Sequence, residues 1–323
     1  MAHRLWRTRI LATLTLAVFG FGAAACGSPH PTRSSVATTA PVPSTTSSTG
    51  VPHVMLVMME NKSYSQVIGN PGVPYINMLA HRYGSATNSY ALLHPSLPNY
   101  LAIVSGSNQE VTDDNDPSAH SFRGTETLAD QLAGRGISEK AYAENLPPDP
   151  RTNAGLYAVR HVPWLYFPGT RISLTDASQV VADLDNTNPP AFVWYTPNLT
   201  NDGHTGVPTD TVNQQLADSE AFLSSFVPLV QTTGWYKSGG VIVIEWDEAE
   251  GSDTSGVNAS RGGHVPTIVV SAILASHPRQ QSEPVDTLGV LRSIEDAYRL
   301  PHLGGAADPK CGNIDGLVAP VPS

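Results

Sequence analysis

The chain has 323 residues, of which 40% are hydrophobic and only 14% charged, and its formal net charge is −10. A surface that binds a polyanion normally has a basic excess, so this composition argues against nucleic acid as a partner. Two cysteines exclude a disulfide-dense scaffold, and beyond the N-terminus no apolar run approaches the roughly 20 residues of a membrane span. An enzyme of this composition that acts on an anionic substrate needs a local source of positive charge.

Residues 1–26 have the pattern of a secretory signal. Basic residues come first, Ile10–Phe21 supplies an apolar stretch, and three alanines precede Cys26. A cysteine directly after small residues resembles the bacterial lipobox, in which the thiol is acylated. We expect an exported protein, either anchored to a membrane through a lipid on Cys26 or, with ordinary cleavage, secreted. Without acylation, Cys26 is free to form a disulfide with Cys311.

Residues 27–52 are rich in serine, threonine and proline, without an aromatic or acidic residue. Such a segment cannot bury enough apolar surface to offset its ordering entropy. We expect a disordered tether there, followed by one catalytic domain over residues 53–323.

The rest of the chain alternates predicted strands and helices. Near-continuous apolar runs indicate buried strands, and one-sided apolar spacing indicates helices. In chain order, we expect a strand over His53–Met59, helices over Ile76–Tyr83, Tyr100–Val104 and Thr127–Ala133, a strand over Glu139–Ala143, a helix over Asp176–Leu184 with Thr175 as its N-cap, a strand over Ala191–Thr196, a helix over Asp210–Gln231, strands over Gly240–Trp246 and Val265–Leu274, and a helix over Val285–Leu300. This alternation predicts an α/β fold, with a mostly parallel central sheet and helices on both faces.

Polar side chains collect next to the predicted strands. In an open α/β sheet, ligands bind beyond the carboxyl ends of the strands, so such clusters predict a site. The clusters are Glu60 and Asn61, then His94, Ser96 and Asn99, then Asp202 and His204, then Asp247 and Glu248, and finally His264.

The residue types in these clusters suggest phosphate chemistry assisted by a metal. Carboxylate and amide oxygens suit Mg²⁺, Ca²⁺ or Mn²⁺, and carboxylates also bind Zn²⁺. A divalent ion would supply the positive charge that the composition lacks. Ser96 is expected near a helix N-terminus, which favours an anion, so we interpret it as a nucleophile rather than a helix cap. His204 and His264 are candidate ligands or phosphate-facing donors.

The segments HVMLVMMENKSYSQVIGN, HPSLPNYLAIVSG, PNLTNDGHTG and VIVIEWDEAEG give the chain a resemblance to a known family. It resembles the phosphoesterase branch of the alkaline-phosphatase-like superfamily, which includes bacterial acid phosphatases and phospholipases C. The resemblance implies an α/β/α sandwich and a phosphoseryl intermediate on Ser96. It also implies a metal site and a phosphate pocket or second metal position: the metal ligands would be Glu60, Asn61, Asp247 and Glu248, and the pocket would be lined by Asn99, Asp202, His204 and His264.

The chain departs from its relatives at two positions. They often carry a histidine at the start of the last helix, where this chain has Asp286 and Thr287, and Thr205 stands where a second aspartate usually follows the histidine of the D-x-H motif. Sulfatases share the fold, but Ser96-Leu97-Pro98-Asn99 lacks the arginine of their motif, which disfavours that activity.

Three further sets of residues have less specific settings. His94 is interpreted either as a general acid and substrate-binding group or as a turn-stabilising residue. We expect His161 to pack with Trp164. The acidic run of Asp113, Asp114 and Asp116 is expected in a solvated loop.

The predicted function is that of an exported, metal-dependent acid phosphatase that hydrolyses phosphomonoesters, with phosphoinositides among the candidate substrates. One alternative is a phospholipase C or other phosphodiesterase with the same site. A second alternative is a catalytically inactive lipoprotein that binds at the cell surface.

Overall fold

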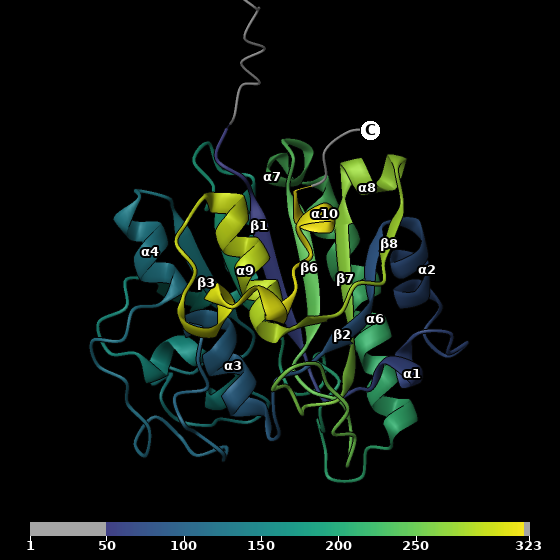
Figure 1. The fold of residues 1–323 in the computed structure, drawn as a ribbon, viewed down its shortest axis with the longest axis horizontal. Helices are drawn as coiled ribbons and strands as arrows, with labels where there is room; N and C mark the ends of the chain where they lie inside the picture. Colours follow the sequence, from purple (N-terminus) through teal and green to yellow (C-terminus); the bar gives the residue numbers. More distant parts are fainter. Residues whose placement is uncertain (1–49, 320–323) are drawn as a thin grey trace, which may run out of the picture. The chain divides into compact units, whose positions relative to one another are not determined.

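A nine-stranded sheet forms the centre of the part of the chain that the computed structural model describes, residues 50–319 (Figure 1). Its strands run in the order β4-β3-β5-β1-β6-β7-β2-β8, and β9 pairs with β2. The strands are β1 (Val54–Met59), β2 (Gly84–Tyr90), β3 (Glu139–Ala143), β4 (Ser173–Asp176), β5 (Phe192–Thr196), β6 (Val241–Trp246), β7 (His264–Ser271), β8 (Arg279–Gln281) and β9 (Val285–Asp286).

The sheet is mostly parallel, as the sequence predicts. β4, β3, β5, β1 and β6 run in one direction, and β7 runs antiparallel to both of its neighbours, β6 and β2. Every residue of β1, β5 and β6 is buried, because these strands lie in the middle of the sheet with helices on both sides. Since β7 is antiparallel, its first residue lies at the same edge as the last residues of β1 and β6.

Helices cover both faces of the sheet. The helices α3 and α9 pack together in front of it in Figure 1, and α6 lies behind it. Both α2 and α5 contact α6. The helices are α1 (Tyr64–Val67), α2 (Pro74–Arg82), α3 (Ser96–Ser105), α4 (Leu128–Gly134), α5 (Val180–Leu184), α6 (Val212–Thr232), α7 (Gly234–Lys237), α8 (Ala272–Ser276), α9 (Thr287–Tyr298) and α10 (Asp315–Val318). The predicted α/β class is therefore confirmed.

Three predicted boundaries are wrong, each where a cap or a strand pairing overrides the local pattern. Thr175 is not a helix cap, because it lies in β4 opposite Tyr142 of β3. β7 ends at Ser271, whose hydroxyl caps α8 by accepting the Leu274 N–H. The last long helix starts only after Asp286, whose carboxylate accepts the first free N–H groups of α9.

Several predictions from the N-terminal sequence lie outside the described residues. The signal segment, Cys26 and nearly all of the tether belong to residues 1–49. Cys311, the other cysteine, is buried and forms no disulfide with any residue of the described part of the chain. Within residues 50–319, no helix is both long enough and apolar enough to span a membrane.

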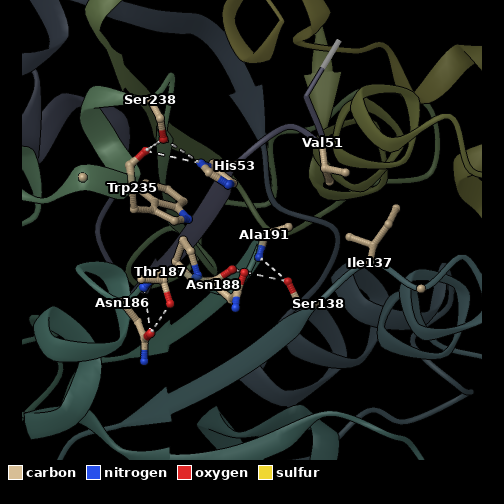
Figure 2. Close-up of a pocket in the computed structure, with 13 residues that line it drawn as sticks. Val51, His53, Ile137, Ser138, Asn186, Thr187, Asn188, Ala191, Trp235 and Ser238 are labelled. Carbon is tan, nitrogen blue, oxygen red and sulfur yellow. Dashed lines mark hydrogen bonds between the residues drawn. The ribbon is translucent and has the colours of Figure 1, made fainter. Parts of the chain in front are cut away.

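A cavity of about 490 Å³ opens at the amino ends of β1, β3 and β5 (Figure 2). His53 stacks on Trp235 there with ring centroids 5.5 Å apart, and Ser138 and Asn188 also line it. None of the predicted site residues lines this cavity, which lies at the opposite edge from the carboxyl ends of the parallel strands. The candidate site therefore lies elsewhere.

Glu295 on α9 gives a test of the packing of this helix. Its side chain is fully buried, with one oxygen accepting the Leu303 N–H and the other unpaired within the described residues. Burial raises the pKa of Glu295 to about 8. Between the ordinary value near 4.5 and about 8, the native state holds a proton that the unfolded state has lost, so rising pH lowers the free energy of unfolding.

We predict that Glu295→Gln removes this contribution, which has a slope of about 1.4 kcal/mol per pH unit. Denaturant unfolding at a series of pH values from 5 to 8 measures it. Equal pH dependence in the two proteins would contradict the assignment.

Candidate active site

Loops after the central strands bring most of the predicted site residues to one edge of the sheet, the lower edge in Figure 1. Backbone hydrogen bonds join these loops: the Glu60 amide donates to the Asp202 carbonyl at 2.9 Å, and the Asp247 amide donates to the Met59 carbonyl at 3.0 Å. The residues gathered there are Glu60 and Asn61 after β1, Asp202 and His204 after β5, Asp247 and Glu248 after β6, and Ser96 at the start of α3.

Glu60 is the most connected side chain of this group. Its Oε1 accepts a hydrogen bond from the Tyr100 hydroxyl at 2.5 Å, and its Oε2 accepts one from the Asn61 amide at 2.6 Å. Asn61 has a φ of +49°, a left-handed conformation that asparagine tolerates better than most residues. The turn therefore starts immediately at the end of β1, which keeps Glu60 pointing into the site.

Ser96 lies between two carboxylates. Its Oγ donates toward Glu60 Oε2 at 3.2 Å and lies 3.4 Å from Glu248 Oε1. Pro95 occupies the N-cap position of α3, so the Ser96 hydroxyl is not used as a helix cap. The serine is thus placed at a helix N-terminus with its hydroxyl facing groups that can accept its proton.

His94 and Asn99 hold the turn that leads into Ser96. His94 Nδ1 is 2.7 Å from Glu248 Oε2, and its Nε2 is 2.8 Å from the Asp253 carbonyl. The hydrogen bond to Glu248 raises the pKa of His94 to about 9. The side-chain amide of Asn99 accepts the Leu93 N–H through Oδ1 and donates to the Leu93 carbonyl through Nδ2. Substrate contact by either side chain stays a prediction.

His161 lies between two buried carboxylates, a position that the expected packing role does not anticipate. Its Nε2 is 3.2 Å from Glu60 Oε1 and its Nδ1 is 3.2 Å from Asp202 Oδ2. Its ring stacks on Tyr100, with centroids 5.2 Å apart. Burial lowers the pKa of His161 well below its usual range, so the ring lies between the two acids as a neutral group. Among the described residues, neither His161 Nε2 nor Asp202 Oδ2 makes a hydrogen bond.

His204 and Arg160 form the opposite side of the site. The Thr205 N–H donates to His204 Nδ1 at 2.6 Å, and Arg160 Nη2 lies 3.3 Å from His204 Nε2. Burial, with the nearby guanidinium, lowers the pKa of His204 to about 4. His204 is therefore neutral, with its proton on the Nε2 nitrogen that faces Arg160.

His264 has a different setting from the other predicted site residues. It opens β7, stacks on Tyr64 with centroids 4.3 Å apart, and places its Nε2 3.1 Å from the Thr87 carbonyl. Its described hydrogen bonds do not include Ser96 or the carboxylates around it. A catalytic role for His264 stays a prediction.

The acidic run from Asp113 to Asp116 is not simply a solvated loop. Asp114 Oδ1 accepts the Leu97 N–H at 3.0 Å, at the start of α3. Asp113 pairs with His120 at 2.6 Å, and Asp116 accepts from Asn153 at 3.1 Å. These contacts hold the loop beside Ser96.

The site is rich in carboxyl groups, and burial makes them costly to ionise. Burial raises the pKa of Glu60 to about 8, aided by the charge of Asp202, and raises the pKa values of Asp202 and Asp247 well above their usual range. Asp202 Oδ2 and Asp247 Oδ2 lack a hydrogen-bond partner among the described residues. Buried charges normally need a partner of opposite sign, so these orphaned oxygens have the chemistry of cation ligands.

The carboxylate, amide and hydroxyl oxygens of this site are of the kind that bind a divalent cation, but they are not arranged around one point. Within residues 50–319, no three histidine, cysteine, aspartate or glutamate side chains surround one point in a metal-binding arrangement. Asn61 and Ser96 add two oxygen donors beside Glu60. The chemistry of the oxygens, and not a preformed cage, supports a metal at this edge.

Five residues of the site are not predicted from the sequence. Lys62 is buried and donates to the carbonyls of Asn61 at 3.0 Å and Gly203 at 2.8 Å. Tyr100 carries a usable signal, because it lies four residues after Ser96 and so shares a helix face with it. The other three, which reach the site only through loop packing, are Asp114, Arg160 and His161.

The fold and this site define a class of protein. The Phosphoesterase family model matches residues 70–301, and the chain belongs to that family. It is a phosphoric ester hydrolase with an alkaline-phosphatase-like α/β fold.

The relatives of this chain agree with this class. It is 30% identical over 260 residues to the phosphatidylinositol-3-phosphatase of Mycobacterium tuberculosis, covering 79% of this chain and 80% of that protein. It is 28% identical over 267 residues to a Kluyveromyces lactis protein named "Probable acid phosphatase", covering 77% of this chain and 58% of that protein. The resemblance to the phosphoesterase branch is confirmed.

Solved structures support the fold. A protein of the alkaline phosphatase superfamily from Vibrio parahaemolyticus superposes with a TM-score of 0.56 at 12% identity, covering 80% of this chain and 71% of that one. The C-terminal periplasmic domain of EcEptC from Escherichia coli, solved in complex with Zn, superposes with a TM-score of 0.52 at 10% identity, covering 79% and 85%.

Lys62 gives a test of how the site is held together. Lys62→Met removes two buried hydrogen bonds and a positive charge that faces the carboxylates. We predict that the free energy of unfolding falls by about 3 kcal/mol in metal-free protein. Because a competing cation has gone, the affinity for a divalent ion should rise.

Lys237→Met is the matched control, because Lys237 is exposed on α7 and donates only to the backbone of Thr232 among the described residues. Denaturant unfolding and calorimetric metal titration measure the two effects. A Lys62→Met protein as stable as the control would contradict this role.

Proposed function

We propose that the chain is an exported, metal-dependent phosphomonoesterase of the acid phosphatase type that works through a phosphoseryl intermediate on Ser96. One observation carries the proposal. The Ser96 hydroxyl lies at the N-terminus of α3, within 3.2 Å of Glu60 and 3.4 Å of Glu248. A hydroxyl between two carboxylates can lose its proton as it attacks, and the helix N-terminus favours the anionic group that it attacks.

The reaction divides into two displacements at phosphorus. The oxygen of Ser96 bonds to phosphorus while its proton passes to the neighbouring carboxylate, Glu60 or Glu248, and the bond to the leaving alcohol oxygen breaks. The leaving oxygen takes its proton from the doubly protonated, imidazolium form of either His204 or His264, which returns to the neutral form. Because burial lowers the pKa of His204 to about 4, the imidazolium form of His204 requires acid pH. Water then attacks the phosphoserine, which releases orthophosphate and returns the proton to Ser96.

Glu60, Asn61, Asp247 and Glu248 would hold a divalent ion beside Ser96, with Asp202 and the histidines lining the phosphate pocket or a second metal position. When bound, such an ion offsets the negative charge of the phosphoryl oxygens and favours the ionised serine. The orphaned oxygens of Asp202 and Asp247 support this assignment. On ligand chemistry alone, the candidate ions are Mg²⁺, Ca²⁺, Mn²⁺ and Zn²⁺.

The relatives suggest the substrate class and the location. Their names, a phosphatidylinositol-3-phosphatase and an acid phosphatase, support phosphate monoesters, with phosphoinositides among them. The N-terminal sequence supports export, with the chain either secreted or attached to the membrane through Cys26. Family membership disfavours the inactive lipoprotein.

Replacing the nucleophile tests the mechanism. Ser96→Ala should lower turnover of a chromogenic phosphomonoester by at least about a thousandfold, because no covalent intermediate can form. Ser105→Ala is the matched control, since Ser105 lies on the same helix with its hydroxyl bonded to Leu101. Phosphorylation of Ser96 in wild-type protein quenched with acid would be detected by mass spectrometry. A Ser96→Ala protein with near wild-type turnover would overturn the assignment.

Metal removal tests the second half of the proposal. Protein stripped with a chelator should be inactive, and one of the four divalent ions should restore turnover. The same panel separates the alternatives when a phosphomonoester and phosphatidylcholine are assayed side by side. Faster hydrolysis of phosphatidylcholine would favour a phospholipase C, and full activity after stripping would exclude metal dependence.

A further inference from the structure

Two hydrogen-bond donors face each other at the side of the site. His204 Nδ1 accepts the Thr205 N–H, so the neutral ring carries its proton on Nε2, and this nitrogen is only 3.3 Å from Arg160 Nη2. The guanidinium has donors and no acceptor. Their contact is a hydrogen bond only in the tautomer whose Nε2 is an acceptor; in the tautomer that accepts the Thr205 N–H, both groups are donors and can bind an acceptor placed beside them.

Arg160 has further unused capacity. Its Nε is buried and has no hydrogen-bond partner among the described residues. The nearest acidic oxygen is Asp114 Oδ2, at the long distance of 3.9 Å. Guanidinium groups bind phosphate through several parallel hydrogen bonds, and Arg160 is positioned to do so beside Ser96.

Asp114 occupies the position between Arg160 and α3. Its Oδ1 accepts the N–H of Leu97, the residue directly after Ser96, while its Oδ2 faces the guanidinium. One carboxylate thus covers a helix N-terminal amide and a cation, which are the groups that attract a phosphate. The Asp114 side chain is 38% exposed, so it can turn toward solvent without crossing the core.

We propose that the Asp114 carboxylate holds the place of the substrate's phosphoryl group and competes with it for these donors. A phosphate takes the Leu97 N–H, the Arg160 guanidinium and the His204 Nε2–H when Asp114 swings out. The inference rests on the proposed function, because it places the phosphate next to Ser96. Orthophosphate, the product, needs the same donors, so Asp114 also weakens product binding and promotes release.

A purely structural role makes a different prediction. If Asp114 only caps α3, its loss weakens the helix and loosens the site, and phosphate binding weakens with it. If it competes, its loss strengthens phosphate binding, because a negative charge leaves the phosphate position. The sign of the change separates the two roles.

The experiment measures the dissociation constant of orthophosphate by calorimetry, and its inhibition constant against a chromogenic phosphomonoester, on protein supplied with a divalent ion. Asp114→Asn keeps an oxygen for the Leu97 N–H and removes the charge. Asp114→Ser is a second variant, which removes the charge and shortens the side chain. Both should bind orthophosphate about tenfold more tightly, which corresponds to about 1.4 kcal/mol.

Asp113→Asn and Asp116→Asn are the controls. They remove the same charge from the same loop, but these side chains bind His120 and Asn153 and not α3. They should leave the orthophosphate constants unchanged. Equal tightening in the controls would assign the effect to the overall charge of the loop and overturn the proposal.

The outcomes also separate this inference from the proposed function. Hydrolysis by wild-type protein with unchanged or weaker orthophosphate binding in both Asp114 variants overturns the inference and leaves the function standing. Tighter orthophosphate binding in the variants, without turnover in any protein, supports the competition and removes the proposed hydrolysis. Orthophosphate binding by none of the proteins overturns the inference.

Discussion

The burial of several carboxylates at one edge of the sheet is the constraint on which the rest of the site depends. Glu60, Asp202 and Asp247 are each at most 1% exposed, and they lie close enough for their charges to raise one another's pKa values. An isolated buried carboxylate takes up a proton rather than stay charged. These carboxyl groups can therefore be ionised together only if a positive charge binds beside them.

The fold contributes part of that positive charge and most of the rigidity. Lys62 is buried among the carboxylates, His94 pairs with Glu248, and Arg160 faces His204. The acids themselves are placed by central strands whose residues are all buried, which leaves the strand ends little freedom. A stable scaffold thus holds a cluster of carboxyl groups that the nearby cationic side chains do not fully balance. This supports the proposal of a divalent ion.

The sequence predicts this site well where the backbone is regular. β1 and β6 are apolar runs that pair in register up to Met59 and Trp246, so the polar residues after each run must lie side by side. The start of α3 is likewise signalled by the Pro-Ser-Leu-Pro run before an apolar stretch. Periodicity and burial are enough to place Glu60, Asp247 and Ser96 together.

The remaining parts depend on tertiary contacts that no local pattern records. β2 has the polar sequence GSATNSY and is a strand because β7 and β8 pair with it. His161 and Arg160 lie on a single 3-10 turn, Val159–His161, which is placed by packing against α3. Asp114 is one of three similar acids, and only the folded loop shows which of them reaches Leu97.

The central claim is that the buried acids hold protons until a divalent ion binds. Calorimetric titration of metal-free protein at pH 6, repeated in buffers of different ionisation enthalpy, counts the protons released per ion bound. More than one proton should be released, because the raised pKa values keep these carboxyls protonated below neutral pH. Binding without proton release, or no binding of any of the four ions, would contradict the claim.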